Sequence, residues 1–405
     1  MSGAAETRSP GRPALAGTSV PAQVDPGSAD APQRRRDLPR CSDGARERCD
    51  PLGASASWTR RWLLLEHPGP WAPDALGGSG LATVVRERLR SAASDAGGRV
   101  LLVRRPAGRP AATRAAARPQ RRWAVVDQPT GLVRWGTWDA ALADPSSRAD
   151  PSSRADPGSR ADPGSRADPA SRADPGGPGR GGPWEACVDE VPADPPAGAV
   201  DPTAARLGGL ADALRALAEP LSPGTDGTSP LLLVCAHGRH DACCAVRGRP
   251  VAAALASRWP EETWECSHVG GDRFAPNLLV LPDGACYGDL DPASAERVVE
   301  EHLAGAVRTR HLRGVTSGPP VAQAAVLGVL GRYGPASVRD AVAGRPVPVG
   351  EDRWEVPVTG SGPLPRQAVV TVRRTRRPPA RLTCRSAGDA VAAVHEAVDV
   401  RLGPS

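Results

Sequence analysis

A run of five hexapeptide repeats limits what this chain can fold into more than any other feature of its 405 residues. Residues 143–172 repeat Ala-Asp-Pro-x-Ser-Arg, with Ser, Gly or Ala at x, and a Gly- and Pro-rich stretch follows. A proline at every sixth position prevents a regular helix, and the repeat contains no Val, Ile or Leu to bury. We therefore predict that residues 141–183 are a disordered insert. Residues 1–40, which are rich in Gly, Pro, Ala and Arg, are predicted to be a disordered tail.

The sequence on both sides of the insert alternates between strand and helix patterns, which predicts an α/β fold. Before the insert, one helix pattern lies among strand patterns, at residues 61–66, 79–93, 99–104, 122–127 and 131–136. After it, similar patterns occur at residues 203–217, 231–234, 250–259, 264–268, 277–281 and 292–304. We interpret them as two related units of thioredoxin type, over residues 41–140 and 184–312.

The C-terminal part of the chain, residues 313–405, has a different pattern. A helix with proline at its start is expected from residue 319 to 330. Strand patterns follow at 353–358 and 368–373, and a last amphipathic stretch covers 388–398. This part is predicted to be a small α+β extension.

Composition excludes several classes of function. No apolar leader and no window of about 18 apolar residues is present, so we expect a cytoplasmic protein that does not enter a membrane. The basic residues are arginines that are dispersed or paired with Asp, and aromatics make up 3% of the chain, so no nucleic-acid partner is expected. In a reducing compartment, clustered cysteines indicate metal, cluster or redox chemistry rather than a disulfide framework.

Two short segments after the insert concentrate the side chains that bind metals. Residues 235–244 read Cys-Ala-His-Gly-Arg-His-Asp-Ala-Cys-Cys and directly follow an apolar strand pattern. Residues 264–273 contain Cys266, His268 and Asp272, with two glycines between the last two. Loops that end neighbouring strands are where α/β folds place their chemistry. We predict a four-ligand metal site that draws one pair of ligands from each segment.

The spacing favours an iron–sulfur cluster over zinc. Structural zinc sites usually contain two short Cys-x2–4-Cys knuckles, which neither segment has. The gap of eight residues between Cys235 and Cys244 suits a bulkier group. A [2Fe–2S] cluster tolerates mixed ligation by cysteine and histidine.

Long motifs resemble the sucrase/ferredoxin-like family. They cover residues 234–250 and 267–284, together with 62–71, Leu312-Arg-Gly314 and Gln323-Ala-Ala325. The resemblance implies that the second unit is a thioredoxin-like ferredoxin domain. It also implies a [2Fe–2S] cluster used in electron transfer or in a redox response, with donor and acceptor proteins that the sequence does not name.

The same resemblance assigns ligands residue by residue. The family's two cysteine ligands fall on Cys235 and Cys244, and the first histidine of a His-x3-His pair falls on His268. The second histidine falls on Asp272, so this chain departs from the pattern at that position. Cys266, two residues before His268, is a softer ligand than Asp272, and we favour it as the fourth ligand over the carboxylate.

Other interpretations stay open. The chain could instead be a thiol–disulfide oxidoreductase that uses Cys235, Cys243 or Cys244, although no Cys-x-x-Cys is present, or a zinc-stapled binding module. An electron-transfer protein is favoured over an enzyme. His237 and His240 are interpreted as donors that tune the cluster sulfurs or as solvated loop residues. The remaining cysteines are expected to be a weak second site (Cys41 and Cys49), a spare thiol (Cys243) and small core residues (Cys187, Cys286 and Cys384).

Overall fold

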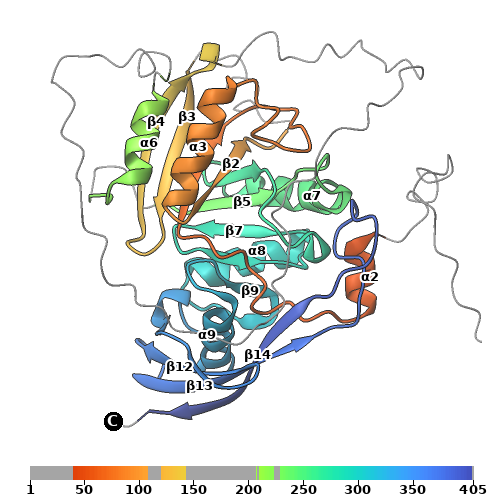
Figure 1. The fold of residues 1–405 in the computed structure, drawn as a ribbon, viewed down its shortest axis with the longest axis vertical. Coiled ribbons are helices and arrows are strands. Elements are labelled where there is room, and N and C mark those ends of the chain that lie inside the picture. The colour runs from red at the N-terminus through yellow and green to blue at the C-terminus, as the bar shows by residue number, and fades with distance from the viewer. Residues whose placement is uncertain (1–39, 108–119, 143–206, 208, 223–228, 404–405) are drawn as a thin grey trace, which may run out of the picture. The chain divides into compact units, whose positions relative to one another are not determined.

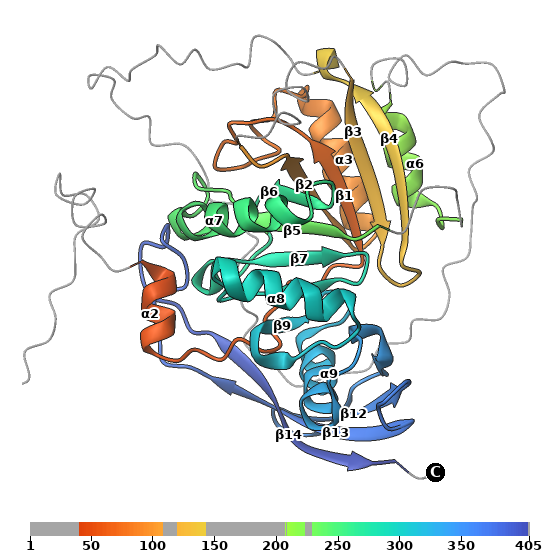
Figure 2. The same ribbon diagram turned by 180° about the vertical axis from the view of Figure 1, so that it is seen from behind.

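A nine-stranded mixed sheet runs through both halves of the chain (Figures 1 and 2). The structure is a computed structural model that describes residues 40–107, 120–142, 207, 209–222 and 229–403. The strand order is β4-β3-β1-β2-β6-β5-β7-β8-β9. The strands in chain order are β1 (Arg61–Glu66), β2 (Gly98–Arg104), β3 (Gln120–Asp127), β4 (Leu132–Asp139), β5 (Leu231–Cys235), β6 (Thr263–Cys266), β7 (Leu278–Leu281), β8 (Ala285–Tyr287) and β9 (Leu312–Val315).

The two halves of this sheet repeat one topology. In the first half β1 is parallel to β2 and antiparallel to β3, which pairs with β4. In the second half β5 is parallel to β6 and antiparallel to β7, which pairs with β8. The halves meet where β2 and β6 pair antiparallel, at Val103–Cys266 and Arg104–Glu265. The predicted α/β class is confirmed, and the two expected units share one continuous sheet.

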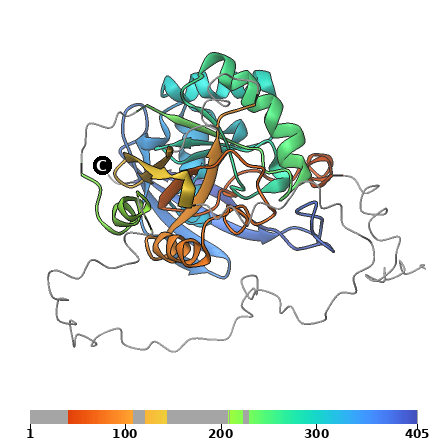
Figure 3. The same cartoon turned by 90° about the horizontal axis from the view of Figure 1, so that it is seen from above.

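Six helices cover this sheet and its C-terminal neighbour within the described part of the chain. They are α2 (Cys41–Glu47), α3 (Thr83–Asp95), α6 (Leu210–Ala218), α7 (Ala242–Arg258), α8 (Pro292–Leu303) and α9 (Pro320–Tyr333). Figure 3 shows orange α3 and light green α6 on the opposite side of the molecule from green α7 and teal α8. Both pairs nevertheless pack on the same face of the continuous sheet, because Val103 and Cys266, which pair where the halves meet, both point into the core on the other face.

Alternation of apolar side chains along the strands explains this arrangement. In β1, Leu63 and Leu65 pack with α3 and α6, whereas Trp62 and Leu64 point to the other face. In β5, the even-numbered residues pack with α7 and α8, and Leu233 joins the same core as Trp62. The faces without helices thus contribute to a core shared by both halves. Six buried cysteines lie in that shared core: Cys41, Cys235, Cys243, Cys244, Cys266 and Cys286.

The C-terminal extension is a five-stranded antiparallel sheet packed on α9. Its strands are β10 (Ala341–Ala343), β11 (Val347–Gly350), β12 (Arg353–Gly360), β13 (Gln367–Arg376) and β14 (Ala393–Leu402). The expected amphipathic stretch at 388–398 overlaps β14, which pairs with β13 over its whole length. The described residues belong to one compact unit.

Two helices differ from the sequence prediction. Helix α7 begins at Ala242 and not near residue 250, because Asp241 caps it and accepts a hydrogen bond from the Cys243 backbone N–H at 2.8 Å. Pro250 lies inside this helix. Helix α6 follows the insert, but it packs against α3, β3 and β4 of the first half. Contacts therefore cross the domain boundary that the sequence suggested.

Several predictions lie outside the described residues: the repeat insert, the tail up to residue 39, and Cys187. No helix in the described ranges is long and apolar enough to cross a membrane.

Candidate metal centre

The candidate centre begins where β5 ends and α7 starts. Cys235 is the last residue of β5 and is fully buried. Cys244 lies in the first turn of α7, which crosses close to the end of β5. Gly248 allows this approach, because a Cβ atom at this position would lie 2.2 Å from the Cys235 carbonyl oxygen. The glycine therefore brings the start of α7 close enough for the two thiols to meet.

A tight turn after β6 supplies the second pair of side chains. Gly270 and Gly271 both have positive φ angles, +94° and +78°, which favour glycine. The turn returns the chain so that Asp272 faces His268, with 3.0 Å between Asp272 Oδ1 and His268 Nδ1. Arg99 donates hydrogen bonds at 3.2 Å to the carbonyl oxygens of His268 and Val269, which hold the turn against β2.

Four side chains from these segments form a closed group. The Cys244 thiol donates to Asp272 Oδ1 at 3.5 Å. Cys244 and His268 lie near enough to Cys235 to lower its pKa, and His268 in turn faces Asp272. Cys235, Cys244 and Asp272 are buried, whereas the His268 side chain keeps 25% of its surface exposed. Two sulfurs, one imidazole and one carboxylate therefore lie beside one another, and one edge of the group reaches solvent.

His240 joins this group in a way that sequence reasoning did not expect. Its ring stacks on His268 with the centroids 3.8 Å apart, and its Nε2 lies 3.9 Å from Asp272 Oδ2. His240, His268 and Asp272 are close enough to share a metal ion. His240 lies in the loop before α7, so the only sequence signal was its place between Cys235 and Cys244.

The electrostatics of the group favour a thiolate beside a protonated imidazole. The hydrogen bond from Cys244 lowers the pKa of Cys235, and His268 lowers it further against the effect of burial. Burial also opposes charge on His268, but the Asp272 carboxylate and Cys235 outweigh it and raise the pKa of His268 to about 9. The pKa of Asp272 is held below its ordinary value because His268 outweighs burial. The group can therefore hold negative charge in a buried place.

Cys266 lies next to this group but does not belong to it. It is opposite Cys235 in the parallel ladder and is fully buried, and burial raises the pKa of its thiol. Neither candidate metal group among the described residues includes Cys266, and neither includes Cys235 or Cys244. The structure thus brings together Cys235, Cys244, His268 and Asp272, and the role of Cys266 as fourth ligand stays a prediction.

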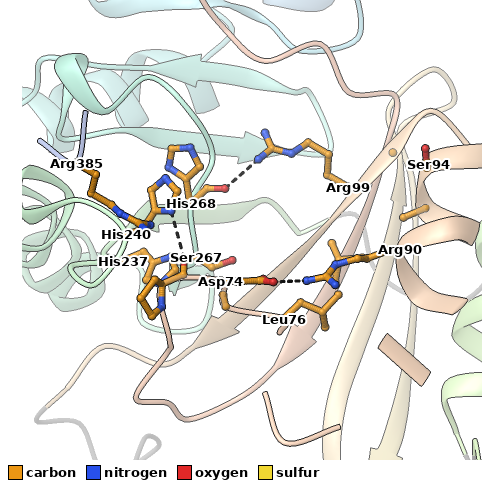
Figure 4. Close-up of a pocket in the computed structure, with 15 residues that line it drawn as sticks. Asp74, Leu76, Arg90, Ser94, Arg99, His237, His240, Ser267, His268 and Arg385 are labelled. Carbon is orange, nitrogen blue, oxygen red and sulfur yellow. Dashed lines mark hydrogen bonds and ion pairs between the residues drawn. The ribbon is translucent and has the colours of Figure 1, made fainter. Parts of the chain in front are cut away.

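A cleft of about 710 Å³ opens beside the group (Figure 4). His237, His240 and His268 line one wall, and Arg99 and Arg385 lie near them. His237 is buried and its Nε2 lies 2.6 Å from the Ala72 carbonyl oxygen, whereas its Nδ1 has no hydrogen-bond partner among the described residues. The exposed edge of the group therefore faces a cleft with a basic rim.

The sucrase/ferredoxin-like family model matches residues 184–314, the segment that carries this group. Over these residues the chain is similar to that family. No curated protein and no solved structure matches the chain significantly. The sucrase/ferredoxin-like region contains all of the predicted ligands, Cys235, Cys244, Cys266, His268 and Asp272.

A second group of cysteines lies at the edge of the sucrase/ferredoxin-like region. Cys41 of α2, Cys243 of α7 and Cys384 of the β13–β14 connection meet around Asp241. These four side chains are close enough to hold a metal ion. The expectation that Cys384 is a simple core residue is wrong, because it is half-buried and its sulfur contacts those of Cys41 and Cys243.

The suggested pairing of Cys41 with Cys49 is also wrong. Cys49 is exposed and does not belong to the group around Cys41. The seven residues between Cys41 and Cys49 include most of the short helix α2, which directs Cys41 into the protein.

Proposed function

We propose that this chain holds a [2Fe–2S] cluster with Cys235, Cys244, His268 and Asp272 as ligands and acts as an electron-transfer or redox-responsive protein. The observation that carries the proposal is the closed group of these four side chains, drawn from β5, α7 and the turn after β6. They lie within the region that matches the sucrase/ferredoxin-like family.

The donor set fits such a cluster chemically. Thiolate sulfur is the preferred donor for iron–sulfur clusters, and imidazole is an accepted replacement on one iron. Arg99 lies close enough to Cys235 and Cys266 to interact with them electrostatically, so it offsets the negative charge that two thiolates and a carboxylate would gather. When bound, the cluster supplies a site that accepts and releases one electron. The protein's residues fix the ligands, exclude water from the sulfurs and expose one histidine edge.

We propose Asp272 rather than Cys266 as the fourth ligand. Asp272 lies within 3.5 Å of Cys244 and 3.0 Å of His268, whereas the charges that act on Cys266 are those of Cys235, Cys286, Glu265 and Arg99. Replacing Asp272 by Ala should then lower cluster occupancy, and replacing Cys266 by Ser should leave it near wild type. The reverse result would support Cys266.

Electrons would enter and leave at the cleft. The His268 and His240 side chains keep 25% and 27% of their surface exposed there, which places the cluster edge close to a docking protein. Arg99 and Arg385 line the same cleft, so we propose an acidic surface on the redox partner.

We also propose that both halves of the sheet are thioredoxin-like units. The basis is their shared strand order, with a helix, α3 or α7, between the two parallel strands of each half. The second unit would be the ferredoxin-type one, since it carries the candidate cluster ligands.

Visible absorption tests the function. Anaerobically purified wild-type protein should be coloured and should bleach with dithionite, and Cys235→Ser and Cys244→Ser should remove the colour. Cys286→Ser is the matched control, because Cys286 lies in the same shared core but outside the group. A colourless wild-type protein with a Cys235–Cys244 disulfide would favour the oxidoreductase interpretation instead.

A further inference from the structure

We propose that Cys41, Cys243, Cys384 and Asp241 form a structural zinc site, separate from the cluster at Cys235 and Cys244. The first evidence is the triangle of sulfurs. The Sγ–Sγ distances are 3.6 Å between Cys41 and Cys243, 3.4 Å between Cys243 and Cys384, and 3.5 Å between Cys41 and Cys384. The three cysteines come from distant parts of the sequence, and clustered cysteines outside a disulfide framework indicate metal, cluster or redox chemistry.

The size of the triangle fits a single metal ion. Four ligands of a tetrahedral zinc ion, with Zn–S bonds of about 2.3 Å, have sulfurs about 3.8 Å apart. The three observed distances are shorter by a few tenths of an ångström, so small side-chain rotations would open the triangle to this size. A two-iron cluster would instead spread its ligands into two pairs on separate irons. The triangle therefore suits one ion, and sulfur-rich tetrahedral donor sets favour zinc.

Asp241 completes the tetrahedron. Its Oδ1 lies 3.9 Å from Cys41 Sγ, within a few tenths of an ångström of the edge of about 3.5 Å expected between a sulfur and an oxygen on one zinc ion. The carboxylate accepts three hydrogen bonds, from the N–H groups of Cys243 and Cys384 and from the Thr383 hydroxyl. Oδ2 accepts two of these bonds and Oδ1 accepts one, so the acceptor position that remains for the metal, once the Cys41 thiol has lost its proton, is on Oδ1. The same three hydrogen bonds fix two of the cysteine ligands around it.

The surroundings also suit a zinc-bound set of thiolates. Ser42 donates a hydrogen bond to Cys243 Sγ at 3.2 Å, and the Cys41 N–H donates to Cys384 Sγ at 3.5 Å. Arg247 donates from Nε to the Ser42 hydroxyl at 2.9 Å, which brings positive charge near the sulfurs. Donors of this kind orient metal ligands and stabilise their charge. Cys41, Cys243 and Asp241 are buried, and only Cys384 is partly exposed, so the ion would have one route of entry.

The site would join three distant parts of the chain. Cys41 and Cys384 are 343 residues apart, and Cys243 lies between them in the sequence. Figures 1 and 2 show α2 beside a blue loop of the C-terminal part and near α7. Cys41 lies on α2, which has only seven residues, and a helix this short is not stable by itself. A zinc ion would therefore fasten α2 and the β13–β14 connection to the start of the helix that carries Cys244.

The two adjacent cysteines of α7 would serve different sites. Successive residues of an α-helix point about 100° apart, so Cys243 turns to α2 while Cys244 turns to Cys235. This explains the vicinal pair, in which one ion or cluster could not easily use both thiols. The zinc site does not depend on the proposed cluster, so each of the two proposals is tested separately.

Metal analysis of the full-length protein tests the inference. We expect about one zinc per chain in wild-type protein purified under reducing conditions with zinc in the medium. Cys384→Ser should lose most of the zinc and keep the iron and the colour, whereas Cys244→Ser should lose the iron and keep the zinc. Cys49→Ser is the matched control, because this exposed cysteine lies eight residues from Cys41 and outside the group.

X-ray absorption at the zinc edge of the wild-type protein keeps the inference testable if Cys384→Ser fails to fold. A first shell of three sulfurs and one oxygen is expected. A shell of oxygen and nitrogen alone, a wild-type protein without zinc, a disulfide between two of the three cysteines under reducing conditions, or zinc retained in Cys384→Ser would each overturn the inference. Zinc without iron would overturn the proposed function and leave this site standing.

Discussion

Arg313 is expected to hold the ligand turn in place, and its replacement by Met is the most informative test of the fold around the site. The residue is 1% exposed and lies on β9. Its Nη1 donates to the Gly270 carbonyl and to Asn277 Oδ1, both at 2.8 Å, and its other nitrogens donate to the Ser55 carbonyl and hydroxyl. One guanidinium thus joins the segment before β1, the turn that precedes Asp272, and the start of β7.

The magnitude follows from the acceptors left behind. Met fills a similar volume but donates nothing, so the Ser55 carbonyl, the Gly270 carbonyl and the Asn277 amide oxygen lose a charged donor. Each buried acceptor without a partner costs about 1–3 kcal/mol, and the three are not additive because they share one donor. We expect the free energy of unfolding to fall by about 3–6 kcal/mol, a large part of the 5–15 kcal/mol typical of a folded domain.

Urea unfolding followed by circular dichroism measures this loss, and metal analysis should show lower iron content because the turn is released. Arg310→Met is the matched control, since Arg310 is exposed and only three residues away, and we expect its change to stay within about 0.5 kcal/mol. A loss below about 1 kcal/mol for Arg313→Met, with iron content unchanged, would refute the reasoning.

Two other predictions concern packing and pH. Gly248→Ala should lower the free energy of unfolding by about 1–3 kcal/mol and reduce iron content, because its Cβ would push α7 away from the Cys235 carbonyl. Gly331→Ala in α9 is the control, because the nearest atom to its Cβ would be 3.7 Å away, and we expect no such loss of stability. An equal loss of stability in both variants would contradict the close approach of α7 to Cys235. Burial raises the pKa of Asp283, but hydrogen bonds from His302 and Arg339 outweigh it and hold this pKa below its ordinary value. Asp283 therefore stabilises the fold above about pH 4, and this contribution is lost as the pH falls through its folded-state pKa. Asp283→Asn should then lower the free energy of unfolding by about 1–3 kcal/mol near pH 7 and by progressively less below about pH 4. A difference independent of pH, measured by thermal unfolding, would argue against this.

The strands of the buried sheet were predictable because their sequences are short apolar runs with few alternatives. Leu231–Cys235 is the clearest case, and its position as a central strand confirms the prediction. The start of α7 was not predictable from apolar periodicity. Pro250 is typical of a first helical turn, but Asp241 caps the helix nine residues earlier through a hydrogen bond that the sequence pattern does not reveal.

The candidate site was only partly visible in the sequence. Cys235, Cys244, His268 and Asp272 belong to two compact motifs, so their proximity could be expected from local order and strand pairing. The group of Cys41, Cys243 and Cys384 depends on contacts between the two ends of the described chain. Such contacts are determined by the packing of the whole unit, and the local sequence around Cys384 does not predict them. The helix α6 shows the same limit, because it follows the insert but packs against strands that precede it.

The content of iron and acid-labile sulfide in anaerobically purified full-length protein tests the central claim most directly. The account predicts two irons and two sulfides per chain in the wild-type protein, and a loss of both in Cys244→Ser but not in Cys384→Ser. Wild-type protein free of iron and sulfide after reconstitution with both would contradict the assignment of Cys235, Cys244, His268 and Asp272 as cluster ligands.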